Sequence, residues 1–388
     1  MHFFLALSII AGQFGYLDTG FGIRLYVAEL LLVLFIARHI YTFGLRPLRQ
    51  MLRLKPLIMW VWIVFLGWVM GIVTASISDN IRSLAYILRL GLLIVGTHCL
   101  YRSPSHKKVS ALLYVIPVIC MTQYILLPDL RFLQQYGWDP HMYRAVGTIF
   151  DPPVVGSILG LLWLSFLMTH ATIFVIPAKA GIPKKFLNKH VYLFGIFTFA
   201  SIIFLYSRST YISLLLVTSV YLISHRKYLY TGLFALMTVL SIYNAPLTIP
   251  PRINLESAKI GRISTATSRM TEIREGIRAW STSPFVGIGY NRVSEYKRHL
   301  NAKSTTTVSN HADSAFHSFW VTQLATTGVI GVTLLLVSML LLIRWRIELF
   351  YPVLWVSIIG VFDNVVFHPL VVISFVLLFI SKRHSLVS

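Results

Sequence analysis

Apolar runs, each about as long as a membrane-crossing helix, follow one another along almost the whole of this chain. A helix needs roughly 20 apolar residues to cross a bilayer, and 56% of the 388 residues are hydrophobic while only 12% are charged. Soluble domains carry about 25% charged residues, so a soluble enzyme is excluded as the main interpretation, as are disordered and collagen-like chains. A window of about 19 residues predicts spans near residues 3–19, 21–42, 56–76, 84–101, 109–127, 153–176, 191–206, 210–224, 228–246, 316–343, 349–363 and 366–381.

The predicted fold is an all-α polytopic membrane protein with about twelve transmembrane helices in one domain, residues 1–388. A long, partly helical loop, residues 247–315, joins the ninth and tenth spans. The first span is weak because the segment 12–15 interrupts it with two glycines. A signal peptide is the alternative there, and we favour a retained span because no clear cleavage site follows. Cys99 and Cys120 fall in or near apolar runs and are expected to be ordinary core residues.

Basic residues outnumber acidic ones by 34 to 13, giving a net charge of +21. Half of the positive residues lie in short loops at every second connection, which predicts that these loops and both termini are cytoplasmic. They are Arg46, Arg49, Arg53, Lys55, Arg102, Lys107, Lys108, Lys179, Lys184, Lys185, Lys189, Arg226, Lys227, Arg344, Arg346, Lys382 and Arg383. Because this charge is spread over separate short segments, no nucleic-acid partner is expected.

The long loop 247–315 is also basic, although it falls on the opposite, outer side. Its positive residues are Arg252, Lys259, Arg262, Arg269, Arg274, Arg278, Arg292, Lys297, Arg298 and Lys303. Long loops cross a membrane largely regardless of their charge, so the arrangement is permitted. An anionic ligand on the outer side is the simplest reason for it.

Two short segments place an arginine at the outer membrane boundary. Ser207-Arg208-Ser209 separates two apolar runs, and Arg144 precedes a Gly- and Pro-containing turn that leads into the next span. A guanidinium group binds phosphate in a planar fork, so both arginines are candidates for a phosphate site. The alternatives are that Arg208 extends to lipid headgroups and that Arg144 pairs with Asp151.

Residues 267–280 are predicted to form an amphipathic helix on the outer surface of the membrane domain. Its apolar side chains share one face at spacings of 3, 4 and 3: Met270, Ile273, Ile277 and Trp280. At about 100° per residue, Arg269 lies at the edge of that face and is expected to point inward, whereas Arg274 and Arg278 turn further away. The alternative is a solvated basic helix without a site.

His317 directly precedes a long apolar run on the outer side. A histidine there can act as a general base near neutral pH, while the alternative is a plain interfacial residue. His311 also precedes that run, and His368, near another outer boundary, is a weaker competitor. His317 is favoured because it is the histidine that accompanies the arginines described above.

Together these segments resemble the O-antigen ligase and O-antigen polymerase family of bacterial envelope enzymes. The resemblance rests on Ser207-Arg208-Ser209, on Arg269 with Pro284 and Gly287-Ile288-Gly289 after it, and on the segment 315–320 with Thr327-Gly328 and Gly331 following. The stretch 144–152 resembles an earlier loop of the family. Ser318 stands where the family usually has Asn, and Ile273 where an aromatic residue is common.

The resemblance implies a GT-C-like glycosyltransferase in the bacterial inner membrane, with its active site facing the periplasm. The donor would be a glycan on undecaprenyl diphosphate, and the acceptor a hydroxyl of lipid A–core for a ligase or of another lipid-linked glycan for a polymerase. Membrane lipids would surround the enzyme. Some relatives in this family glycosylate proteins instead.

The mechanism implied by this resemblance is inverting and uses neither a metal nor a cofactor. His317 would deprotonate the acceptor, and Arg208 and Arg269 would stabilise the departing diphosphate. Four further residues would help to bind it: Arg144, Arg274, Ser207 and Ser209. A divalent cation prefers several oxygen ligands, and the acidic residues placed on the outer side include no Asp-x-Asp pair.

Two other classes of membrane protein remain as alternatives. A transporter of lipid-linked sugars would place polar residues near the membrane midplane, where Arg24, Glu29 and Arg89 are the candidates. A cell-wall glycan polymerase would rely on an outer carboxylate, and Glu272, Glu275 or Asp313 would have to serve.

Overall fold

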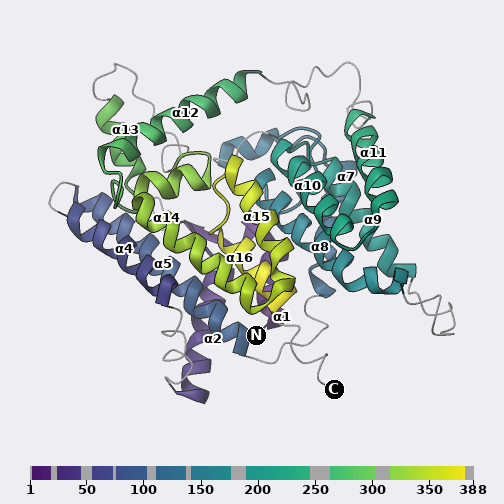
Figure 1. Ribbon diagram of the computed structural model, residues 1–388, viewed down its shortest axis with the longest axis horizontal. Helices are drawn as coiled ribbons and strands as arrows, with labels where there is room; N and C mark the ends of the chain where they lie inside the picture. Colours follow the sequence, from purple (N-terminus) through teal and green to yellow (C-terminus); the bar gives the residue numbers. More distant parts are fainter. Residues whose placement is uncertain are drawn as a thin grey trace.

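The computed structural model describes residues 2–18, 24–44, 55–72, 76–102, 111–136, 141–175, 189–244, 263–301 and 315–380. Most of these residues are helical (Figure 1). The helices are α1 (His2–Ala11), α2 (Val27–Phe43), α4 (Lys55–Gly71), α5 (Ile77–Arg102), α7 (Val115–Leu126), α8 (Pro152–Val175), α9 (Lys189–Ile203), α10 (Arg208–Ser224), α11 (Tyr228–Asn244), α12 (Ile263–Thr282), α13 (Val293–Asn301), α14 (Phe319–Trp345), α15 (Phe350–Phe362) and α16 (Pro369–Phe375). Shorter helical segments are η1 (Gly12–Gly15), η2 (Arg131–Tyr136), η7 (Ile347–Leu349) and η8 (Val376–Ile380).

Each predicted span overlaps a helix of the structure. Three stretches in the described part of the chain are long and apolar enough to cross a membrane by length and composition, namely Asp79–Leu100, Pro152–Thr169 and Phe319–Trp345. The others that qualify as apolar are 10–17 residues long, so helix length does not confirm the predicted number of spans. Cys99 and Cys120 are free and buried, as predicted.

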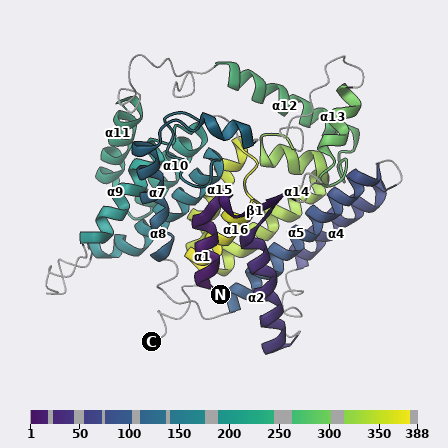
Figure 2. The same cartoon turned by 180° about the vertical axis from the view of Figure 1, so that it is seen from behind.

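The all-α prediction is confirmed for the fold as a whole, and near the N-terminus the structure adds a small hairpin. Strand β1 (Tyr16–Asp18) pairs antiparallel with β2 (Arg24–Tyr26), and Figure 2 shows β1 close to α1. The first helix ends early because Gly12 has a φ of +57° and lies against the backbone of Thr148, where a Cβ would come within 2.6 Å of the carbonyl oxygen. The amide of Gln13 also donates to that oxygen, at 2.9 Å.

Helix α8 forms the centre of the core, with 78% of its apolar window buried. It packs against α9, α10, α15 and α16. Small residues permit the close approach: Gly160 lies against the fully buried Trp355, and Gly156 against Thr210. Small residues at helix contacts are typical of membrane proteins, in which close van der Waals packing replaces the hydrophobic effect.

Helices α12 and α13 lie together at the upper edge of Figure 1, above α14, and α1 begins at the lower edge. Helices α12 and α13 belong to the predicted outer loop. Residues 247–262 and 302–314 of this loop lie outside the described residues. The basic residues of the predicted cytoplasmic loops at positions 46–53, 107–108, 179–185 and 382–383 also lie outside them. The described elements of the outer loop therefore cover the ends of the bundle helices at one edge of the molecule.

Candidate functional site

The segment Ser207-Arg208-Ser209 is the first turn of α10. Ser207 is the N-cap, and its Oγ atom accepts hydrogen bonds from the Thr210 amide at 3.4 Å and the Thr210 hydroxyl at 2.9 Å. The hydroxyls of Ser207 and Ser209 are 3.0 Å apart. Serine is a favoured N-cap, so the sequence itself fixes where this helix begins. Arg208 is its first residue and is half-buried, at the end where the helix dipole favours anions.

The loop that carries Arg144 packs beside this turn. The Ala145 amide donates to the carbonyl oxygen of Phe204 at 3.0 Å, and the amides of Val146 and Gly147 donate to Gln123 Oε1 at 3.0 and 3.1 Å. Arg144 is close enough to Tyr211, in α10, for its charge to act on the phenol. The structure therefore brings two of the predicted arginines to the start of one helix.

His317 lies immediately before α14, as predicted. Ser318 is the N-cap of α14 and accepts from the Val321 amide at 3.4 Å, while its hydroxyl donates to the Gly360 carbonyl at 3.3 Å. Asparagine and serine are both good N-caps. The departure at position 318 from the residue usual in the family thus preserves the capping function, and it ties the start of α14 to α15.

Arg269 points inward from α12, as predicted. Its Nη2 atom donates to Asp363 Oδ1 at 3.0 Å, and the two side chains are 28% and 6% exposed. Asp363 directly follows α15. Burial of a carboxylate in this way requires a charged or hydrogen-bonding partner, which Arg269 provides.

Asp363 is the point at which three elements meet. Besides Arg269 of α12, the side chain of Ser209 in α10 hydrogen-bonds to the carboxylate, and the His317 ring before α14 is close enough to act on its charge. The Oδ2 atom of Asp363 and the Nε atom of Arg269 are buried without a hydrogen-bond partner among the described residues. Buried polar atoms are rarely unpartnered, so these atoms mark the place as a candidate ligand site.

Glu272, one turn beyond Arg269, is a site residue that sequence analysis did not select. Its Oε2 atom is 2.5 Å from Nδ1 of His317 and accepts from the His317 amide at 2.9 Å. Forty-five positions separate the two residues. The spacing of Arg269 and Glu272 on one helical face was the available signal, since residues i and i+3 lie together on a helix.

The glycine motifs of the sequence join α12 to α14. Gly328 has a φ of +64° and interrupts α14 with a non-helical turn. The segment 284–289 fills this break: the Ile288 amide donates to the Ala325 carbonyl at 2.8 Å, and the Val329 amide to the Pro284 carbonyl at 2.9 Å. A Cβ on Gly287 would lie 2.3 Å from the Thr326 carbonyl carbon. These glycines position α12 over His317.

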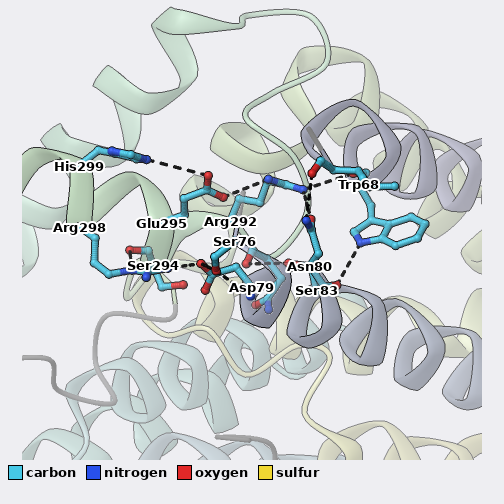
Figure 3. A network of polar contacts seen from close by, with 12 residues as sticks. Trp68, Ser76, Asp79, Asn80, Ser83, Arg292, Ser294, Glu295, Arg298 and His299 are labelled. Atoms are coloured by element: carbon cyan, nitrogen blue, oxygen red, sulfur yellow. Dashed lines mark hydrogen bonds and ion pairs between the residues drawn. The ribbon is translucent and has the colours of Figure 1, made fainter. Parts of the chain in front are cut away.

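Helix α13 fixes the other side of the outer segment to α4 and α5 (Figure 3). Arg292 is 5% exposed and donates to Asn80 Oδ1 at 2.8 Å, to the Trp68 carbonyl at 3.3 Å and to Glu295 at 3.0 Å. Arg298 pairs with Asp79. Arg292 and Arg298 of the outer loop therefore have a structural role.

The structure does not bring every predicted residue to this site. Arg274 and Arg278 are exposed, and Arg274 lies about 140° around α12 from Arg269 at 100° per residue. The predicted apolar face is not the packed one, because Met270 and Ile277 are 52% and 46% exposed. Gly276 and Ala279 pack instead, since the small Gly276 allows contact with Val321 and Phe316.

His368, the weaker competitor, is not part of the site. His368 Nε2 is 3.1 Å from the hydroxyl of Tyr26, at the start of α2, and His311 lies outside the described residues, as does Asp313. In the described part of the chain, no group of three or more His, Cys, Asp or Glu side chains could hold a metal ion.

The motifs that meet at Asp363 also mark the part of the chain that matches a known family. Residues 193–336, which hold Arg208, Arg269 and His317, match the family model described as O-antigen ligase. Over these residues the chain is similar to the O-antigen ligase family. No curated protein matches it.

This match supports a glycosyltransferase family of ligase or polymerase type. The family is membrane-embedded, in agreement with the apolar helices of this chain. Asp363 lies beyond the matched residues, yet the fold brings it to the centre of the site.

Proposed function

We propose that this protein is an O-antigen ligase, which transfers a glycan from undecaprenyl diphosphate to a hydroxyl of lipid A–core. The transfer inverts the anomeric centre, needs no metal ion and takes place at the periplasmic face of the inner membrane. The observation that carries the proposal is the convergence of Ser209, Arg269 and His317 on Asp363. In this proposal His317 is the base, and Arg269, which meets the same carboxylate, is a ligand of the diphosphate.

The reaction would proceed by direct displacement. The acceptor hydroxyl gives its proton to Nε2 of His317 while its oxygen attacks the anomeric carbon and forms the new C–O bond. The bond between that carbon and the phosphate oxygen breaks, and its electron pair leaves with the diphosphate. Attack opposite the leaving group inverts the configuration.

Arg208 and Arg269 would stabilise the negative charge that grows on the diphosphate. Arg269 uses Nη2 for Asp363, and its Nε has no partner among the described residues. A guanidinium has five N–H donors, so one contact with a carboxylate leaves donors for phosphate. Arg144 lies beside the same helix start and would assist, together with the hydroxyls of Ser207 and Ser209.

The proposed topology has about twelve spans, cytoplasmic termini and a periplasmic loop formed by residues 247–315. The alternation of basic loops in the sequence supports this orientation. The placement of α12 and α13 at the edge opposite the start of α1 supports it as well (Figure 1).

A transporter is less well supported. Transport sites hold polar groups available near the membrane midplane, whereas Arg89 and Glu29 pair with each other in the core, with side chains 14% and 1% exposed. The side chain of Arg24 lies outside the described residues. A catalytic carboxylate of the cell-wall polymerase type is also less well supported, because Glu272 already pairs with His317.

The test is transfer by the purified protein, with an undecaprenyl-diphosphate-linked glycan as donor and with lipid A–core, a second lipid-linked glycan or a peptide as separate acceptors. Glycosylated lipid A–core is the expected product. A product on the second lipid-linked glycan would instead identify a polymerase of the same family. Absence of transfer to every acceptor, together with movement of the donor across vesicles, would contradict the proposal.

A further inference from the structure

One oxygen atom of Glu272 holds both the backbone and the ring of His317. Oε2 accepts from the His317 amide at 2.9 Å and lies 2.5 Å from Nδ1 of the same residue. One contact fixes the backbone of His317 and the other fixes its ring, although the side chain is 39% exposed. A histidine that only marked the membrane boundary would not need such a double contact.

The ionisation of Glu272 decides which ring nitrogen carries the proton. Burial alone would raise the pKa of Glu272, but the hydrogen bond from His317 and the charge of Lys297 outweigh it and hold the pKa below its usual value. An ionised carboxylate only accepts hydrogen bonds. Nδ1 therefore donates, and the lone pair of the neutral ring is left on Nε2. Among the described residues, Nε2 has no hydrogen-bond partner.

Lys297 of α13 balances the charge of Glu272 from the other side. Its Nζ atom is 4.0 Å from Glu272 Oε1 and 3.3 Å from the Ala315 carbonyl oxygen, and its side chain is 8% exposed. It also lies 5.3 Å from the centre of the Phe316 ring. A nearly buried lysine needs an anionic partner, so Lys297 and Glu272 support each other beside the histidine.

We propose that Glu272 is the positioning residue of the catalytic histidine and that Lys297 holds Glu272 in place. This inference rests on the proposed function, in which His317 takes the proton of the acceptor hydroxyl at Nε2. Glu272 fixes the tautomer and the direction of the ring and stabilises the imidazolium that forms, which is the role of the carboxylate in a Ser-His-Asp triad. Among the residues that the structure describes, Asp363 and its partner Arg269 are the other charged groups near the ring.

The test compares Glu272→Gln with Glu275→Gln, which removes a carboxylate from the next turn of the same helix. Each variant is purified as a monodisperse protein, and kcat, KM and the pH–rate profile are measured per folded molecule. Glu272→Gln should lower kcat by about 10²-fold or more, because general-base catalysis contributes about 10²–10⁴-fold. It should leave KM for the donor nearly unchanged and move the acidic limb of the profile to lower pH, because the imidazolium loses its anionic neighbour.

Lys297→Met should shift the acidic limb of the pH–rate profile in the opposite direction. Removal of the positive charge exposes the imidazolium to an uncompensated carboxylate, so the acidic limb should move to higher pH, while Lys297→Arg should restore the wild-type profile. A merely structural role for either residue would lower the amount of folded protein without moving the limb.

His317→Ala separates this inference from the proposed function. If His317→Ala is inactive while Glu272→Gln matches Glu275→Gln in kcat and in pH profile, the positioning role is wrong and the proposed function stands. If His317→Ala transfers at the wild-type rate, the assignment of the base is wrong. A fall in folded protein with unchanged kcat for Glu272→Gln would also overturn the inference.

Discussion

Arg269 and Asp363 are joined by a 3.0 Å hydrogen bond across 94 positions of the chain. The contact ties α12, which lies over the edge of the bundle, to the connection between α15 and α16. Ser209 hydrogen-bonds to the same carboxylate. Asp363 therefore also fixes the position of α12 relative to the first turn of α10. One buried carboxylate thus holds the two segments that carry Arg208 and Arg269.

Replacement of Arg269 should remove transfer activity. Arg269→Ala is expected to lower kcat by about 10²–10³-fold, because one charge-stabilising donor contributes about that much. Arg269→Lys keeps the charge but not the planar fork, and should recover only part of the rate. Arg278→Ala, an exposed position on the same helix, is the control and should transfer normally. Equal rates for Arg269→Ala and Arg278→Ala would refute the role of Arg269.

Arg208 is expected to be equally sensitive. Arg208→Ala should lower kcat by about 10²–10³-fold, while Arg226→Ala, which alters an exposed arginine just past the opposite end of α10, should have little effect. Transfer is measured on protein that has inserted into the membrane, so that a loss of activity is distinguished from a loss of expression. Loss of activity in both variants would indicate a general effect of α10 rather than a phosphate contact.

Excess chelator should not stop the reaction. In the proposed scheme arginines stabilise the diphosphate, a task that a divalent cation performs in other enzymes. The initial rate is measured before and after dialysis against EDTA. Complete loss of transfer that Mg²⁺ or Mn²⁺ restores would contradict the arginine scheme.

The glycine contacts between α12 and α14 should be sensitive to one added methyl group. Gly287→Ala places a Cβ at a φ of +71° and 2.3 Å from the Thr326 carbonyl carbon, and should destabilise the protein by more than about 1 kcal/mol. Gly232→Ala is the control, because a Cβ there meets no atom within 4 Å. Thermal unfolding in detergent should give a lower Tm for Gly287→Ala alone, and equal Tm values would contradict the interlocked arrangement.

The Glu272 contact should persist at neutral pH and weaken in acid. The pKa of Glu272 is lowered from 4.5 in the folded protein, so its contribution is complete above about pH 4.5 and is lost as the pH falls through the lower value. Hydrogen exchange of α12, corrected for the intrinsic pH dependence, should stay slow from pH 7 to about pH 5 and accelerate in stronger acid. Equal protection of the α12 amides at pH 3 and pH 7 would show that this contact does not hold α12.

Local patterns in the sequence predicted the parts of the site that depend on local physics. The break at Ser207-Arg208-Ser209 between two helices, the inward direction of Arg269 and the place of His317 before α14 were all predicted in this way. The apolar spans likewise predicted the helical, membrane-embedded architecture.

The rest depended on tertiary contacts that no local pattern contains. Glu272 meets His317 across 45 positions and Asp363 meets Arg269 across 94, so nothing near them in the sequence identified those partners. The packed face of α12 was misjudged for a related reason: the close approach of α14 favours Gly276 over the larger Met270.

The most direct test of the central claim is transfer from the lipid-diphosphate donor to purified lipid A–core by wild-type protein and by His317→Ala, both in excess EDTA. We expect a product of inverted anomeric configuration from the wild type and at least about a 10²-fold lower rate from the variant. Equal rates from the two proteins, or a product of retained configuration, would contradict this claim.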